Sequence, residues 1–259
     1  MSPRTALCSA IVGVVFLVPA CDKAPSPPAS PTAVEAPESA NTASAVSATA
    51  SDSSKPKKPG LEICAPATGG FSLASTNPYF PLQVGHHWQY EGEEEGSVVQ
   101  LHVTVLDAVE VIAGVTTHVV EERESHDGEL VEVSRNYFAE ASDGTVCYFG
   151  EDVDIYEDGA VVSHEGAWRA DGPGNQPGII MPADPRPGTK FVMESAPGVA
   201  EDQGTVVGSG PVEVPAGAFP DAIRVKELNP LDGDRGLKVF ARGVGLVIDG
   251  TVQLVSQTF

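Results

Sequence analysis

Residues 98–106 read VVQLHVTVL, and this stretch decides the fold class. Apolar side chains occupy every second position from Val99 to Val105, and Gln100, His102 and Thr104 stand between them. Successive side chains of a β-strand point to opposite faces, so this spacing predicts a strand with one apolar face. No window of the chain combines a helical period with capping residues. We therefore expect an all-β protein.

Further β-rich runs follow this stretch and are separated by turn residues. Asp-Gly pairs, as at 127–128 and 158–159, favour type I′ hairpins, because both central residues of that turn need positive φ. Consecutive hairpins predict an antiparallel meander, which curls into a barrel or a half-barrel-like sheet to hide its edges. Besides 98–106, the expected strands are 115–124, 129–139, 145–149, 152–157, 160–164, 190–194, 205–207, 222–227, 237–241 and 251–256.

One segment, Asp171–Gly188, is rich in Pro and Gly and is predicted to be irregular. Long irregular loops in compact domains often bind ligands or cover sites. The apolar centre of this segment, from Ile179 to Met181, is therefore either part of a binding loop or a plug for one end of the core.

Residues 1–20 have the layout of a signal peptide, with Arg4 ahead of an apolar run that is too short for a transmembrane helix. Cys21 follows the sequence Val-Pro-Ala, which resembles the bacterial lipobox. The resemblance implies that Cys21 is acylated, for example with palmitate, and becomes the mature N-terminus. We therefore expect a membrane-anchored lipoprotein of the cell envelope, facing the periplasm or the exterior. The alternative is an ordinary secretory signal and a secreted protein.

Residues 21–60 begin at the lipid-acceptor cysteine and consist mostly of Ala, Pro, Ser and Thr, without an aromatic residue. Such a segment cannot bury enough apolar surface to offset the entropy lost on ordering. It is predicted to be a disordered tether. Aromatic and aliphatic residues return after it, so the expected β-rich globular domain is 61–259.

The balance of charge excludes several partners. The chain has 36 Asp and Glu residues against 15 Lys and Arg, a formal net charge of −21. A nucleic-acid-binding protein needs basic residues to neutralise phosphates, so we expect no nucleic-acid partner. The same excess argues against electrostatic binding to anionic lipids. We expect membrane contact through the N-terminal lipid alone.

Cys64 and Cys147 remain after the signal peptide and the lipid-acceptor cysteine are set aside. Paired cysteines in an exported chain are often oxidised, so we predict a disulfide between them. It would attach the start of the domain to the strand at 145–149.

The densest acidic run is 151–158. A two-residue turn at Asp158-Gly159 would place Asp152 opposite Glu165, and Asp154 shares the face of Asp152. Three carboxylates on one side of a hairpin could hold a hard cation such as calcium, or could serve acid–base chemistry. The competing interpretation is a solvated acidic face. No zinc spacing, phosphate loop, dinucleotide fingerprint or nucleophile elbow occurs, so we expect no enzyme and no other cofactor.

Two groups of motifs show a resemblance. The domain opens with Tyr79-Phe80-Pro81-Leu82, Gly85 and Trp88-Gln89-Tyr90, and it closes with Gly243-Val244-Gly245-Leu246-Val247. This order resembles an uncharacterised family of bacterial exported β-rich lipoproteins. The resemblance implies an antiparallel curled sheet, similar to the half-barrel of lipoprotein carriers, and it assigns no catalytic residue.

These observations predict a ligand-binding or envelope-structural β domain on a flexible tether. A curled sheet can enclose a pocket, so a small apolar ligand is the expected partner, with an envelope protein as the other candidate. The alternative is an exported hydrolase or cation-dependent domain that uses the acidic cluster.

Overall fold

The computed structural model describes residues 8–10, 13–15 and 60–258. The predicted tether and Cys21 lie outside the described residues, as does most of the predicted signal peptide. Two short strands, β1 (Cys8–Ala10) and β2 (Gly13–Val15), form an antiparallel pair. The rest of the described structure consists of residues 60–258.

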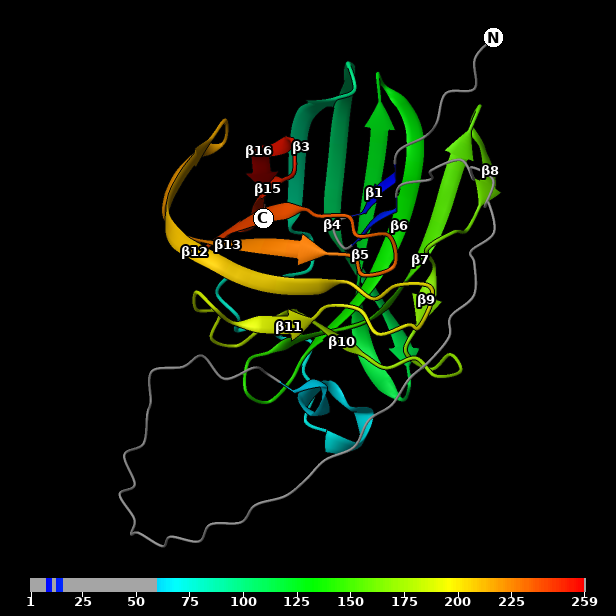
Figure 1. The fold of residues 1–259 in the computed structure, drawn as a ribbon, viewed down its shortest axis with the longest axis vertical. Coiled ribbons are helices and arrows are strands. Elements are labelled where there is room, and N and C mark those ends of the chain that lie inside the picture. Colours follow the sequence, from blue (N-terminus) through cyan, green and yellow to red (C-terminus); the bar gives the residue numbers. More distant parts are fainter. Residues whose placement is uncertain (1–7, 11–12, 16–59, 259) are drawn as a thin grey trace, which may run out of the picture. The chain divides into compact units, whose positions relative to one another are not determined.

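These residues form a single 14-stranded antiparallel sheet, which confirms the predicted all-β meander (Figure 1). Strands β3 to β7 pair in chain order, and β11 to β16 do the same. The first and last of these strands, β3 and β16, pair with each other and join the two arms. The strands are β3 (His87–Glu94), β4 (Ser97–Ile112), β5 (Val115–His126), β6 (Glu129–Glu140), β7 (Val146–Glu157), β8 (Ala160–Ser163), β9 (Trp168–Arg169), β10 (Gly178–Met181), β11 (Lys190–Val192), β12 (Gln203–Val214), β13 (Gly217–Leu228), β14 (Leu237–Ala241), β15 (Gly245–Asp249) and β16 (Val252–Thr258).

The sheet curls until its two edges approach each other without forming a continuous ladder. The strand order begins with β10 and ends with β11. An isolated bridge joins the segments next to them, where the backbone N–H of Gln176 donates to the carbonyl of Ser195 over 2.9 Å. In Figure 1 the arm β12–β14 runs across the direction of β4–β7, as expected when one twisted sheet folds over itself.

Tight turns set the register of the long hairpins. Both central residues have positive φ at Glu95-Gly96, Ala113-Gly114, Asp127-Gly128 and Asp158-Gly159. These are the backbone angles of the type I′ turn, which matches the twist of the strands it joins. The predicted hairpins at Asp127-Gly128 and Asp158-Gly159 are present. Two further hairpins have Glu95 or Ala113 in place of the aspartate before the glycine.

The expectation for Asp171–Gly188 was wrong at its centre. Residues 178–181 form the edge strand β10, which pairs with β7. Ile179, Ile180 and Met181 are fully buried, so their apolar character reflects a strand within the core. The Pro and Gly residues on both sides concealed a strand of only four residues.

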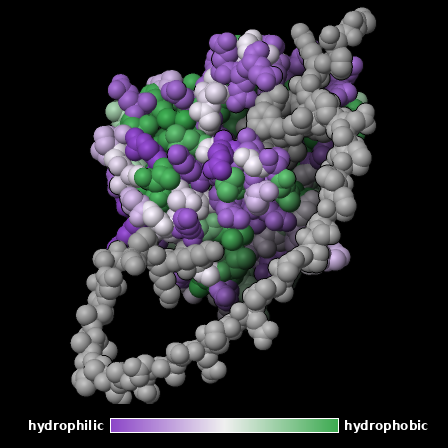
Figure 2. Space-filling model, viewed as in Figure 1, coloured by the Kyte–Doolittle hydropathy of each residue, from purple (hydrophilic) through white to green (hydrophobic). Residues whose placement is uncertain are grey.

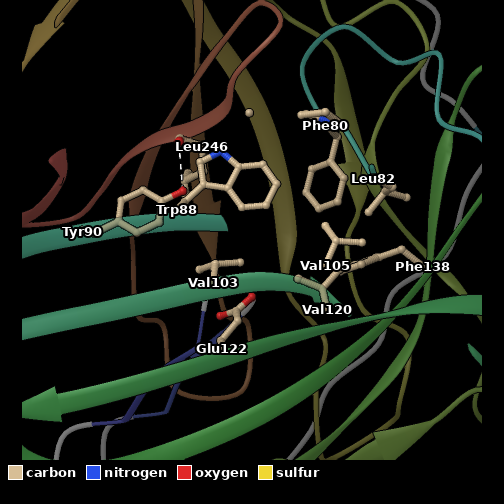
Figure 3. A pocket seen from close by; sticks show the side chains of 12 residues that line it. Phe80, Leu82, Trp88, Tyr90, Val103, Val105, Val120, Glu122, Phe138 and Leu246 are labelled. Carbon is tan, nitrogen blue, oxygen red and sulfur yellow. Dashed lines mark hydrogen bonds between the residues drawn. The ribbon is translucent and has the colours of Figure 1, made fainter. Parts of the chain in front are cut away.

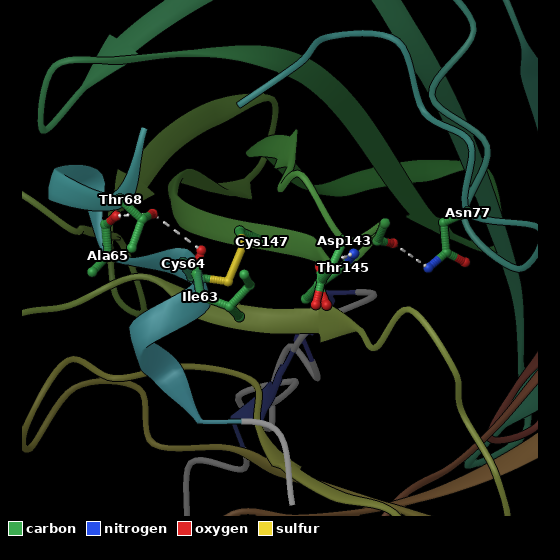
Figure 4. Close-up of a disulfide and its surroundings, with 9 residues drawn as sticks. Ile63, Cys64, Ala65, Thr68, Asn77, Asp143, Thr145 and Cys147 are labelled. Carbon is green, nitrogen blue, oxygen red and sulfur yellow. Dashed lines mark hydrogen bonds between the residues drawn. A yellow bond between two sulfur atoms is a disulfide. The ribbon is translucent and has the colours of Figure 1, made fainter. Parts of the chain in front are cut away.

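A strap, residues 60–86, precedes the first long strand and contains two short 3-10 helices, η1 (Leu61–Cys64) and η2 (Pro66–Thr68). Figure 4 shows a disulfide between Cys64 and Cys147 of β7, whose Cα atoms are 5.5 Å apart. The buried Glu140 carboxylate accepts hydrogen bonds from the backbone N–H groups of Thr76 and Asn77 and from the Thr76 hydroxyl. The strap is thus attached to the sheet at several points along its length.

Hydrophilic side chains cover most of the described surface seen in Figure 2, and apolar residues there occur in small separate groups. Scattered apolar residues are normal on a protein surface. The large apolar side chains instead gather between the two arms of the sheet and under the strap.

Candidate binding site

An apolar pocket lies inside the curled sheet, with a volume of about 40 Å³. Figure 3 shows side chains of the strap and the sheet converging on it. Its lining comes from the strap (Phe80, Pro81, Leu82), β3 (Trp88, Tyr90), β4 (Val103, Val105), β5 (Val120, Glu122), β6 (Phe138) and β15 (Gly245, Leu246). All of these residues except Glu122 present apolar surface, which is typical of a site for a small apolar group.

Strand register brings the sheet residues of the pocket onto one face. Val103 stands opposite Trp88 on β3 and opposite Glu122 on β5, and Val105 stands opposite Val120. Val103 and Val105, which are alternate residues of the stretch 98–106, therefore line the pocket. This is the apolar face that the period of two predicts.

The two large rings of β3 are fixed by hydrogen bonds to the backbone of the second arm. The Trp88 indole N–H donates to the carbonyl of Val244 over 2.8 Å, and the Tyr90 hydroxyl donates to that of Leu246 over 3.0 Å. Because their polar tips are satisfied outside the pocket, the rings offer it apolar surface. Gly245 has φ of +95° and lies so close to Pro81 that an added Cβ would be 3.2 Å from the proline Cδ.

Glu122 is the one carboxyl group of the lining, and its side chain is buried. Seven more buried carboxyl groups lie in the same interior, and we call the eight together the interior carboxylates. They come from both arms of the sheet and from the segment between β11 and β12. The members are Glu122, Glu124, Glu132, Glu151, Glu194, Asp202, Glu227 and Asp249.

Electrostatic contacts show that the two arms face each other through these groups. Lys238 of β14 interacts with Glu122 of β5, although these strands are not neighbours in the sheet. Glu151 of β7 likewise interacts with Asp202 and Glu194. Side chains from distant strands can meet only across the inside of the curl.

Burial shifts the protonation of several interior carboxylates. It raises the pKa of Glu227 to about 8, although Lys238 acts in the opposite direction. Burial also raises the pKa of Asp202 to about 6. The pKa values of Glu151 and Glu194 lie well above the ordinary range, first because of burial and then because of neighbouring carboxyls. An isolated buried charge is costly, so such groups tend to take up protons.

Lys238 is the only Lys or Arg side chain that is buried within residues 60–258. Its ammonium group donates to Asp249 over 2.7 Å and lies 3.4 Å from Glu227. Burial lowers the pKa of Lys238, but Asp249 and Glu227 more than offset this, so the pKa is raised and the group stays charged.

The structure places Asp152 and Asp154 of the predicted acidic cluster on the opposite side of the sheet from the pocket, where arginines neutralise them. Asp152 accepts from Arg169 Nε over 2.9 Å and from Nη2 over 2.6 Å, and it accepts a third bond from the Tyr137 hydroxyl. The Arg169 hydrogen bonds hold the pKa of Asp152 below its ordinary value. Asp154 lies 3.0 Å from the His164 ring and 3.4 Å from Arg135.

Glu165 does not stand opposite Asp152. The hairpin starts in the expected register, with Glu157 opposite Ala160, but a bulge shifts the pairing so that Ile155 stands opposite Ser163. Beyond Ser163 the chain leaves the ladder, and Glu165 is an exposed turn residue. No group of three Asp, Glu, His or Cys residues that could hold a metal ion occurs in the described parts of the chain.

The Asp152 arrangement has a counterpart on the other arm. There Asp221 accepts from Arg242 and from the hydroxyl of Tyr79, and the Arg242 guanidinium lies 4.9 Å from the centre of the tyrosine ring. In the first set Arg169 lies 5.0 Å from the ring of Tyr137. Each set joins segments that are distant in the chain, so both have the form of structural clamps.

Within residues 8–10, 13–15 and 60–258 there is no helix long and apolar enough to span a bilayer. No family model, curated protein or solved structure matches the chain. The geometry of the pocket and its surroundings therefore carries the functional argument.

Proposed function

We propose that this chain is an exported lipoprotein whose β domain is a binding module for a small apolar ligand. The apolar pocket carries the proposal. Three of its lining residues belong to the strap and the others to five strands, so a ligand would contact both arms of the sheet. Concave apolar sites with a single polar group are typical of small-molecule binding.

The contacts of Asp152 and Asp154 favour a hydrolase less than a binding module. Asp152 is fully engaged by Arg169 and Tyr137, and its lowered pKa is the opposite of what a general acid needs. Asp154 faces Arg135 and His164. Arginine side chains thus occupy the positions where a bound cation would neutralise these carboxylates.

The binding proposal is tested by isothermal titration calorimetry of the purified chain with hexan-1-ol, of which only the terminal carbons would enter a pocket of about 40 Å³. A Val105→Phe variant fills the pocket and should weaken binding at least about tenfold, equivalent to the contacts of two buried methylene groups. Val111→Phe is the matched control, because Val111 lies on the same strand and is 60% exposed. The control should bind within about twofold of the parent.

Two outcomes contradict the proposal. One is the absence of any binding heat for the parent chain. The other is a Val105→Phe variant that keeps its cooperative unfolding transition and still binds as tightly as Val111→Phe.

Anchoring is tested separately by incorporation of labelled palmitate during expression. Lipid should enter the parent chain and a Cys8→Ser control, since Cys8 lies in the predicted signal peptide, and it should be lost in Cys21→Ser. Equal labelling of Cys21→Ser would replace the anchored protein with a secreted one.

A further inference from the structure

The amine of Lys238 is held against two carboxyl groups at a place that solvent does not reach. The Lys238 side chain is 0% exposed, and the side chains of Glu227 and Asp249 are 6% exposed each. Lysine is almost never fully buried unless its ammonium group is paired. The three residues belong to the neighbouring strands β13, β14 and β15, and we call them the buried triad.

Strand pairing fixes the positions of the buried triad. Lys238 stands directly opposite Asp249 on one side and opposite Val225 on the other. Glu227 lies two residues beyond Val225, so its side chain points to the same face of the sheet. Lys238 Nζ lies 2.7 Å from Asp249 Oδ1 and 3.4 Å from Glu227 Oε2. The amine therefore contacts both carboxyl groups.

The second oxygen of each carboxyl group has no hydrogen-bond partner among the described residues. These atoms are Asp249 Oδ2 and Glu227 Oε1. Burial raises the pKa of Glu227 to about 8, so this group is mostly protonated at pH 7. The buried triad thus contains an amine, a carboxyl group in contact with it and a carboxylic acid beside them.

We propose that Lys238 and Asp249 condense to an amide that links β14 to β15 covalently, and that Glu227 transfers the protons of this reaction. The modification goes beyond the binding function and does not depend on it. An amine hydrogen-bonded to a carboxylate lies about 3.5 Å from the carboxyl carbon, which is a productive distance for attack. Groups held in this way react as though at very high concentration.

The reaction is a condensation and needs no oxidant, reductant or cofactor. Lys238 is charged in the resting pair, so a proton first passes from its Nζ to Oδ1 of Asp249. This transfer removes two charges from the dry interior, which offsets part of its cost. Nζ then bonds to Cγ of Asp249 while Glu227 Oε2 accepts a proton from the nitrogen. Glu227 Oε1 gives its proton to the departing oxygen, the Cγ–O bond breaks, and one water molecule leaves.

The arginine ion pairs of this protein lack these conditions. Arg169 and Arg242 also bind carboxylates, but a guanidinium stays protonated in proteins and supplies no neutral amine. The ammonium group of a buried lysine loses its proton far more readily. Burial also protects the product, because hydrolysis of the amide would need water at Asp249.

The proposed bond lies at a place where the sheet has few backbone contacts. Strands β14 and β15 have five residues each, and β15 is the strand through which the second arm reaches β16. Only two residue pairs join β15 to β16. A covalent link between β14 and β15 would keep this short connection in register.

The test is tandem mass spectrometry of a tryptic digest of the purified, denatured and reduced chain. Trypsin does not cleave after a lysine whose amine is acylated. The linked protein should therefore give one branched peptide, in which residues 236–242 are joined to 243–259 with the loss of one water molecule. An unlinked chain gives 236–238, 239–242 and 243–259 as separate peptides. A folded parent chain that yields only the separate peptides overturns the proposal.

A pair of variants tests the part played by Glu227. Glu227→Gln keeps both reacting residues but cannot transfer the protons, so the yield of branched peptide should fall at least about tenfold. Glu124→Gln is the matched control, because Glu124 is buried to a similar degree and bonds to His126. The control should give the yield of the parent. A Glu227→Gln variant that is folded by circular dichroism and links as completely as the control overturns the role of Glu227.

A third variant keeps the charge but removes the amine. Lys238→Arg should give only the separate peptides, because a guanidinium does not attack the carboxyl carbon. This result does not depend on how well Glu227→Gln folds. A branched peptide that persists in Lys238→Arg would show that the link is made by another residue, and it would overturn the proposal.

Discussion

Lys238 shows how strongly single residues determine the interior of this protein. Its side chain is completely buried, and its ammonium group lies between Asp249 and Glu227. Exchanging a whole buried ion pair for apolar residues is often harmless, whereas removing one partner leaves a buried charge without compensation. The energetic importance of Lys238 should therefore appear when it is replaced alone.

We expect Lys238→Met to destabilise the domain by about 3 kcal/mol at pH 7, because Asp249 loses the cation that balances it. The loss should be smaller at pH 4, where the carboxyl groups can take up protons. Urea unfolding followed by circular dichroism measures both values. Lys226→Met, at an exposed position of β13, should change stability by less than about 0.5 kcal/mol. Equal effects of the two substitutions would show that the buried lysine is not a counter-ion.

Gly178 lies where the two edges of the sheet are in close contact. A Cβ added there would lie 1.8 Å from the carbonyl oxygen of Met193, so the backbones of the two segments would have to separate. We expect Gly178→Ala to cost about 2 kcal/mol in the free energy of unfolding. Gly208→Ala is the control, since nothing lies within 4 Å of the added atom. A Gly178→Ala variant as stable as the control would mean that the edges are not in contact.

Among the elements, the strap has the least regular structure and the most varied attachment to the sheet. It is held by the disulfide to β7, by hydrogen bonds to Glu140 and by the contact of the His118 ring with the carbonyl of Leu73. It also supplies Phe80 and Leu82 to the pocket. Its position therefore couples the stability of the domain to the shape of the binding site.

Replacing Cys64 and Cys147 together with alanine should lower the free energy of unfolding by up to about 4 kcal/mol. The disulfide joins residues 83 positions apart, so its removal frees a long segment of the unfolded chain. Guanidinium unfolding of the parent and the variant, each with and without reductant, measures the effect. Reductant should weaken the parent and leave the variant unchanged. A parent that resists full reduction without loss of stability would contradict this expectation.

Individual elements differ in how well the sequence predicts them. The alternation from Val99 to Val105 predicts β4 because each apolar side chain contacts the interior directly. The edge strand β10 was missed because three buried apolar residues between Pro and Gly carry no period. Its strand conformation is imposed by pairing with β7, and this pairing is a contact distant in sequence.

The site was predicted less well than the fold. The hairpin at Ala113-Gly114 fixes which residues of β5 share a face with Val103, but only Asp-Gly pairs were interpreted as hairpin turns. Recognising that turn would have placed Glu122 on the apolar face. The interior carboxylates of the other arm could not have been found in this way, because no local pattern specifies which strands meet across a curled sheet.

At the scale of the whole molecule, the interior carboxylates make stability depend on pH. The folded pKa values are about 6 for Asp202, about 7 for Glu124 and about 8 for Glu227, and burial is the main cause of each increase. A carboxyl group with a raised folded pKa binds its proton more tightly in the folded state than in the unfolded state. Its contribution to stability is therefore complete below pH 4 and is lost as the pH rises through the folded value.

We accordingly expect the urea midpoint of the domain to fall steadily between pH 5 and pH 8.5. Asp152 has the opposite effect, because Arg169 lowers its pKa. Its contribution to stability is lost as the pH falls below about 4. Glu227→Gln should flatten the upper part of the profile, because one of the titrating groups is then absent. A midpoint that stays constant or rises up to pH 8.5 would contradict the predicted protonation of the interior.

Because β3 pairs with β16, the sheet can be completed only after its last strand has been synthesised. Ribosomes make a chain from its N-terminus, so the last strand to emerge is the one that joins the two arms at the middle of the sheet. A nascent chain that ends before residue 252 has two separate meanders, with unpaired edges at β3 and β15. The two arms therefore cannot join until Val252–Thr258 has been made, and a stop codon within these seven strand residues would leave both halves prone to aggregation.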